Sequence, residues 1–137
     1  MTVMLPPEYK PSDDEAFMNP KMREYFRRKL IGWRNELLDA STETLLHLQE
    51  GGLLAPDIAD RASAETDRSL ELRTRDRARK LISKIDKALK RVDDGDYGYC
   101  DETGEEIGLE RLEARPIATL SLDAQERWEH RQKLMGD

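Results

Sequence analysis

The sequence predicts a mainly α-helical protein: a long antiparallel coiled-coil hairpin, a small finger-like globular module and a C-terminal helix. Two long stretches carry apolar residues mostly at three- and four-residue steps, and only a short segment with two glycines separates them. Charged residues make up 38% of the 137 residues, and aromatic residues only 6%. So little apolar material suits a seam with one buried stripe on each helix better than a large round core.

The first predicted helix follows an irregular N-terminal segment, residues 1–18, which contains three prolines. Asn19 and Pro20 are typical of a helix entrance, with Asn19 as the cap and Pro20 at the first helical position. Gly51 and Gly52 predict its end, because glycine readily adopts the left-handed conformation of many helix termini. The apolar positions between these limits are Met22, Phe26, Leu30, Trp33, Leu37, Leu45 and Leu48.

The second predicted helix runs from Asp57 to Asp94 without glycine or proline, and Gly95 ends it. Two long helices joined by a few residues fold back on each other. We therefore predict a coiled-coil hairpin over residues 19–94 with its tip near residues 51–62. The apolar side of the second helix consists of Leu70, Ala78, Leu81, Ile82, Ile85, Leu89 and Val92.

Residues 95–137 predict the globular module and the C-terminal helix. Four glycines in the 14-residue segment GDYGYCDETGEEIG favour a compact knuckle of turns and short strands. A short helix is expected before Pro116. Ser121 or Asp123 can cap the final helix, and we expect Trp128 on its buried side.

The composition excludes several classes of protein. A net charge of −6 argues against direct DNA binding, which needs a surplus of cations. No apolar run approaches the roughly 20 residues of a membrane span, and the N-terminal residues do not resemble a secretory signal. The single cysteine excludes an internal disulfide framework. No set of residues typical of a catalytic site is present. We expect a cytoplasmic, monomeric, non-enzymatic protein.

Charge is segregated along the chain. Residues 73–91 contain nine basic and two acidic side chains, whereas residues 93–113 contain nine acidic side chains and one arginine. One interpretation is a solvated helix face with a neutralising neighbour. The other is a docking surface for an acidic partner or a phosphorylated ligand.

Two segments, DIADRASAETDRSLELRTRDRARKLISKIDKALKRVDDGDYGYC and GEEIGLERLEARP, resemble the DksA family of RNA polymerase-binding transcription factors. The resemblance runs from about Pro20 to the C-terminus and is strongest from Asp57 to Pro116. It implies a regulator that enters the secondary channel of RNA polymerase and destabilises promoter open complexes. It also implies joint action with guanosine tetraphosphate (ppGpp) in the stringent response.

The resemblance implies specific site residues. The family's tip motif, which approaches the active-site region of the polymerase, corresponds here to Asp57, Asp60 and Ala62. The alternative role for these acids is to stabilise the first turn of the helix. The residues that correspond to the family's ppGpp site are Arg77, Leu81, Lys84, Arg111 and Arg115. Gln125 stands where the family commonly has a lysine, which predicts weaker contact with phosphate.

The family often carries a zinc site made of two CxxC pairs, and here the four positions are Cys100, Thr103, Ser121 and Ala124. A closed structural zinc site needs four ligands, and only Cys100 supplies a thiolate. We therefore predict no zinc, with the hydroxyls of Thr103 and Ser121 hydrogen-bonded instead. The acids that follow Cys100 are expected to disfavour its thiolate form. Packing must replace the metal, and the candidates are Tyr97, Tyr99, Ile107, Leu109, Leu112, Ile117, Leu120, Leu122 and Trp128.

Two alternatives to this function remain open. A structural coiled-coil interaction protein explains the helical seam but not the tip motif. A secondary-channel factor of the transcript-cleavage type also uses an acidic hairpin tip.

Overall fold

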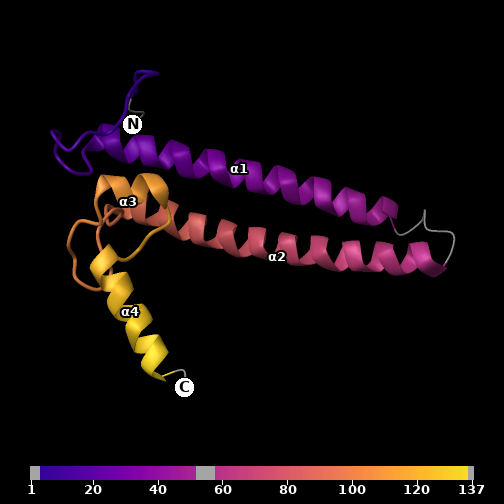
Figure 1. The fold of residues 1–137 in the computed structure, drawn as a ribbon. Coiled ribbons are helices and arrows are strands. Elements are labelled where there is room, and N and C mark those ends of the chain that lie inside the picture. The colour runs from indigo at the N-terminus through magenta and orange to yellow at the C-terminus, as the bar shows by residue number, and fades with distance from the viewer. Residues whose placement is uncertain (1–3, 52–57, 136–137) are drawn as a thin grey trace. The chain divides into compact units, whose positions relative to one another are not determined.

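The fold is mainly helical, as the sequence predicts. The computed structural model describes residues 4–51 and 58–135, with the side chains of 44, 45, 47–51 and 58–61 left undescribed. Its helices are α1 (Pro20–Gly51), α2 (Ile58–Asp94), α3 (Leu109–Ala114) and α4 (Leu122–Met135) (Figure 1). The short strands expected in the knuckle are not formed within these ranges. An isolated antiparallel bridge between Tyr99 and Glu106 takes their place, because the glycine-rich turns on either side leave too few residues for a ladder.

The start of α1 confirms the predicted cap. The backbone N–H of Met22 donates to the Asn19 side-chain oxygen at 3.0 Å, and Pro20 is the first helical residue. The other end of the Asn19 amide donates to the Ala16 carbonyl at 2.9 Å. Asn19 therefore joins the helix to the segment that precedes it. Gly51 is the last residue of α1, and the predicted Gly52 terminator lies outside the described residues.

The chain forms two compact units, and α1 and α2 contribute to both. One unit consists of residues 1–31 and 87–137, and the other of residues 32–86. In each unit, α1 and α2 run in opposite directions (Figure 1). In the second unit Arg34 Nε of α1 pairs with Asp86 Oδ1 of α2 at 2.6 Å. The domain boundaries inferred from the sequence stay a prediction.

The core of the first unit gathers residues from all four helices, three of them from α1. Phe26 of α1 is fully buried and packs on the ring of Tyr97 at a centroid distance of 5.6 Å. The Tyr97 hydroxyl donates to the Pro116 carbonyl at 2.8 Å, and burial raises the pKa of this phenol. The other hydrophobic residues buried in this core are Met18, Met22, Leu30, Ala88, Val92, Cys100, Ile107, Leu112, Ala118 and Ala124.

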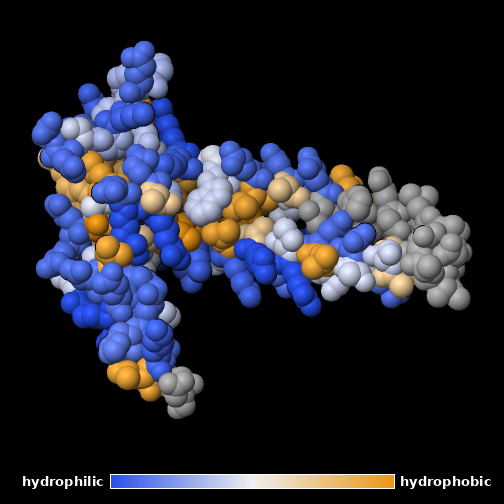
Figure 2. All heavy atoms as spheres, in the orientation of Figure 1, coloured by the Kyte–Doolittle hydropathy of each residue, from blue (hydrophilic) through white to orange (hydrophobic). Residues whose placement is uncertain are grey.

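Only the first turn of α4 reaches this core, which corrects two predictions. Trp128, expected on the buried side, is 45% exposed, and Leu122, expected to replace zinc by packing, is also exposed. Ala124 is the buried residue of the helix, and the α4 residues that follow it are half-buried or exposed. Figure 2 shows hydrophobic atoms at the far end of this helix, where Leu134 and Met135 are exposed.

The second unit buries fewer of the predicted apolar residues than the sequence suggests. Ile85 is fully buried and Leu81 half-buried, but Leu70, placed on the apolar side from the sequence, is about half exposed. Two packed helices alone can cover only part of each apolar stripe. Among the described helices, none combines the length and hydropathy that crossing a lipid bilayer requires.

Candidate functional site

The acidic tip lies mostly beyond what the structure describes. Asp57 is outside the described residues, and Asp60 belongs to α2 but its side chain is not described. Ala62 is exposed one turn into the helix. The role of the tip carboxylates therefore stays a prediction.

A row of cations runs along one face of α2 in the second unit. Its members are Arg73, Arg77, Lys80 and Lys84, spaced four, three and four residues apart, and all four are exposed. Side chains at this spacing share one helix face. No ion pair among the described residues involves them, because Asp76 pairs with Arg79 and Asp86 pairs with Arg34. We call this set the basic row, and it presents four uncompensated charges over about three turns.

The residues expected to contact ppGpp divide into exposed and structural ones. Arg77 and Lys84 are exposed members of the basic row, whereas Leu81 on the adjoining face is half-buried. Arg111 and Arg115 belong to the other unit. Arg111 Nε donates to the Leu120 carbonyl at 2.9 Å and thereby ties α3 to the following loop. Arg115 follows the end of α3 with an exposed side chain.

Gln125, where the resemblance implies a lysine, is half-buried in α4. Its side-chain amide donates to Glu129 at 3.1 Å, one turn further along the helix. The side chain is therefore engaged within its own helix and brings no charge to a phosphate.

An ion pair that the sequence analysis missed holds α3 against α1. Lys29 Nζ lies 2.6 Å from Glu113 Oε2 and also donates to the Glu113 carbonyl at 3.2 Å. Burial opposes ionisation of Glu113, but hydrogen bonds from Lys29 and Tyr25 prevail and lower its pKa. Burial, then the hydrogen bond and charge of Glu113, raise the pKa of Tyr25 to about 12. No local pattern signals this contact, because its partners lie 84 residues apart.

The knuckle brings Cys100 together with two of the other three degenerate zinc positions. Cys100 is 3% exposed. Burial raises the pKa of its thiol, but hydrogen bonds from the Thr103 hydroxyl and from the backbone N–H groups of Ser121, Thr103 and Glu102 outweigh burial and bring it to about 6. The expectation that neighbouring acids disfavour the thiolate was wrong, because these donors, rather than carboxylates, surround the sulfur.

These four positions do not fit a zinc ion. The Ser121 hydroxyl accepts the Ala124 N–H at 3.2 Å, which makes Ser121 the predicted cap of α4. The Thr103 hydroxyl accepts the Glu105 N–H at 3.2 Å. Ala124 is fully buried and offers no ligand atom. A structural zinc site needs four N, S or O ligands, whereas these positions offer one thiol, two hydroxyls that already accept backbone N–H groups, and a methyl group.

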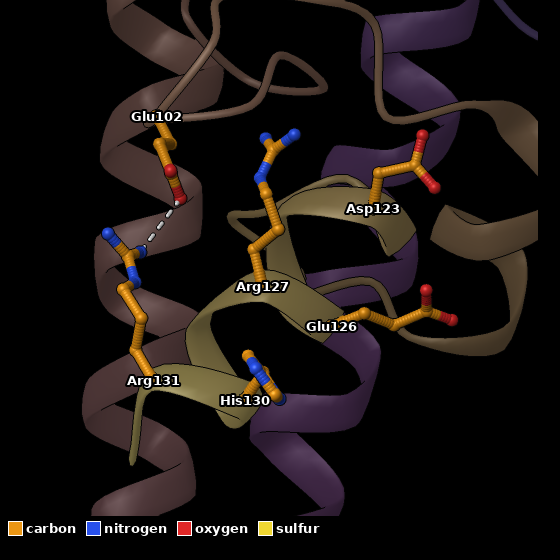
Figure 3. Close-up of a pocket in the computed structure, with 6 residues that line it drawn as sticks. All are labelled: Glu102, Asp123, Glu126, Arg127, His130 and Arg131. Atoms are coloured by element: carbon orange, nitrogen blue, oxygen red, sulfur yellow. Dashed lines mark ion pairs between the residues drawn. The ribbon is translucent and has the colours of Figure 1, made fainter. Parts of the chain in front are cut away.

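A surface hollow of about 560 Å³ lies between α4 and the knuckle. Figure 3 shows Arg131 paired with Glu102, Arg127 beside them, and Asp123 and Glu126 on the other side. The Arg131–Glu102 distance is 3.5 Å. Three carboxylates face two guanidinium groups, so the hollow carries no positive surplus for a phosphorylated ligand. Its lining residues are Glu102, Asp123, Glu126, Arg127, His130 and Arg131.

The fold and the site define a helical-hairpin protein with a knuckle module and a basic row on α2. Comparisons with known proteins identify its family. The profile described as "DnaK suppressor protein DksA, N-terminal domain" matches residues 22–92. The profile described as "Prokaryotic dksA/traR C4-type zinc finger" matches residues 95–130. The chain therefore belongs to the DksA family, which confirms the resemblance seen in its sequence.

Individual relatives agree with this assignment. The chain is 62% identical over 130 residues to the RNA polymerase-binding transcription factor DksA of Caulobacter vibrioides, covering 95% of this chain and 92% of that protein. It is 49% identical over 128 residues to the protein of the same name from Escherichia coli K12, covering 93% and 85%. The solved structure of transcription factor DksA2 from Pseudomonas aeruginosa matches with a TM-score of 0.80 and 43% identity, covering 85% of this chain and 90% of that one. This match confirms the predicted fold class.

Proposed function

We propose that this protein regulates transcription by binding RNA polymerase through the secondary channel, where it destabilises promoter open complexes together with ppGpp. The observation that carries the proposal is the 62% identity, over 95% of the chain, to a relative named for its binding to RNA polymerase. The family's characteristic segments extend through α2, the knuckle and α3, so the similarity covers the expected contact residues.

The basic row supports binding to an acidic protein surface rather than to DNA. Its four cations lie on one face of α2, while the whole chain carries a net charge of −6. The surrounding acids repel the phosphates of a long duplex, whereas a short cationic row can still steer docking onto a local acidic patch. Such steering acts mainly on the association rate, and salt weakens it.

Binding in the secondary channel also gives roles to the residues of the tip and of the candidate ppGpp site. Asp57 and Asp60 would bring carboxylates to the active-site region and act there by Coulomb interaction, without a catalytic step of their own. Arg77 and Lys84 of the second unit supply exposed cations for ppGpp. Arg115, an exposed residue of the first unit, remains a candidate from the resemblance alone. Because Gln125 adds no charge, the response needs more ppGpp than a lysine-containing relative needs. We also propose that the protein acts as a monomer in the cytoplasm.

A binding experiment with purified core polymerase tests the proposal. The full chain should form a stable complex with polymerase, both free and bound to promoter DNA, and should shorten the lifetime of open complexes. Free duplex DNA at physiological salt should show no binding. Binding to free duplex with none to polymerase would overturn the proposal. Cleavage of stalled transcripts by the bound protein would favour a transcript-cleavage factor instead.

A further inference from the structure

We infer that the knuckle module of this protein closes without a metal and that the segment before α1, residues 9–19, serves as a strap that stabilises it. The chain departs from its family at the positions of the zinc ligands. The matched profile is that of a four-cysteine zinc finger, yet the chain has one cysteine and its other three positions cannot complete a zinc site. Something else must hold the two halves of the knuckle together.

Some of the contacts that hold the module together in place of a metal are polar and lie within the module. The Asp101 N–H donates to the Thr119 carbonyl at 2.8 Å, which joins the half that contains Cys100 to the half that contains Ser121. Arg91 of α2 reaches the same region, with a guanidinium nitrogen 2.6 Å from the Tyr99 carbonyl and another contact to Asp101 at 3.1 Å. These bonds fix the backbone but bury little apolar surface.

The strap supplies apolar contact directly before Cys100. The Phe17 ring meets the Tyr99 ring edge-on at a centroid distance of 5.5 Å, an arrangement that aromatic pairs favour. Met18 is buried, and Gly98 presses against both strap residues. A Cβ added at Gly98 would lie 3.1 Å from Met18 atoms and 3.2 Å from Phe17, closer than most Cβ contacts, and the φ of 94° at Gly98 is one that residues with a side chain rarely adopt.

The strap is itself held in a defined conformation. The Glu15 carboxylate accepts the Tyr9 hydroxyl at 3.0 Å and the Ser12 N–H at 3.0 Å, and the Tyr9 ring packs edge-on against Tyr25 of α1. Met18 has a φ of 54°, in the left-handed region that residues with a side chain rarely adopt. Such a conformation persists only where surrounding contacts enforce it. The packing of Met18 beneath the knuckle therefore enforces the turn into α1.

Thermal unfolding and amide hydrogen exchange of the full chain test the inference, with Phe17→Ala as the variant. Met4→Ala is the matched control, because Met4 belongs to the same N-terminal segment but is 87% exposed. We expect Phe17→Ala to lower the melting temperature by on the order of 5 °C. The amides of Cys100 and Ile107, which donate to Glu105 and Gly98 carbonyls, should exchange faster. Met4→Ala should change neither quantity, and a chelator should leave the parent protein unchanged.

Three results would overturn the inference. One equivalent of zinc per chain, with melting lowered on chelation, would show a metal-closed module. A Phe17→Ala protein that behaves like Met4→Ala would show that the strap contributes nothing. Equally faster exchange in residues 32–86 would show a general loss of stability rather than an opening of the knuckle. If Phe17→Ala does not fold, Phe17→Leu, which keeps most of the apolar volume, should show a smaller effect of the same kind.

Discussion

Replacing Glu113 by glutamine removes the charge that holds α3 against α1 while keeping the side chain's size. In the parent protein Lys29 Nζ lies 2.6 Å from Glu113 Oε2, and Tyr25 also hydrogen-bonds to this carboxylate. The glutamine oxygen can still accept from Tyr25. The Lys29 contact to the Glu113 backbone carbonyl is also retained. The variant therefore isolates the ionic part of the contact.

The expected cost is about 1 kcal/mol. Ion pairs between exposed side chains contribute about 0.2–1 kcal/mol, and charge-assisted hydrogen bonds contribute somewhat more. The side chains of Lys29 and Glu113 are 35% and 38% exposed, so solvent screens the pair and keeps the value near the top of the exposed range rather than above it. With a urea dependence of about 2 kcal/mol per molar, the unfolding midpoint should fall by about 0.5 M.

The contribution of ionised Glu113 to the free energy of unfolding depends on pH. The folded protein lowers the pKa of Glu113 below the ordinary value of 4.5, so the ionised form stabilises the fold. This stabilisation is fully present above pH 4.5 and is lost as the pH falls through the lower folded pKa. Parent and variant should therefore differ in urea unfolding at pH 7, and the difference should shrink as the pH falls below about 4.5.

Glu106→Gln is the control, because Glu106 is exposed and its side chain makes no ion pair within the described ranges. It should leave the urea midpoint within error of the parent protein at every pH. Equal midpoints for the parent and the Glu113→Gln variant at pH 7, or a difference that persists unchanged in acid, would refute the reasoning.

Three further predictions concern the cap, the tip and the basic row. Asn19→Ala removes the bond to the Met22 N–H and should lower the free energy of unfolding by about 1 kcal/mol, measured by urea unfolding, whereas Asn19→Ser should recover most of it. Asp60→Asn should leave polymerase affinity nearly unchanged and sharply reduce repression of a sensitive promoter in vitro; full repression would reduce Asp60 to a helix-stabilising acid. Lys84→Ala should abolish the added effect of ppGpp on transcription while keeping ppGpp-independent action, and an unchanged ppGpp dose response would remove Lys84 from that site.

Much of the helical architecture was predictable because its determinants are local. Asn19, Pro20 and Gly95 act through the conformations of their own backbone segments, and each marks a helix boundary in the structure. The apolar spacing of α1 and α2 likewise depends on helix geometry alone. The similarity of the tip and effector segments to a known family added residue assignments that no periodicity can provide.

The wrong predictions and the missed contacts have one physical reason. Each depends on contacts between segments that lie far apart in the sequence. Trp128 lies at a helical spacing that favours burial, yet the core reaches only the first turn of α4. The acids beside Cys100 in sequence do not surround its sulfur, which faces hydrogen-bond donors from two loops. The contact between Lys29 and Glu113 and the packing of Phe17 on Tyr99 join segments that no local pattern connects.

Site-specific photo-crosslinking from the hairpin tip tests the central claim most directly. Ala62 belongs to the predicted tip motif and its side chain is exposed, so a photo-crosslinking amino acid in its place should leave the fold intact. In complexes with RNA polymerase we expect crosslinks to the largest subunits near the active site, whereas the same probe in place of Glu106 should not reach that region. Crosslinks from position 62 only to the outer surface of the polymerase, or none at all in a stable complex, would contradict entry through the secondary channel.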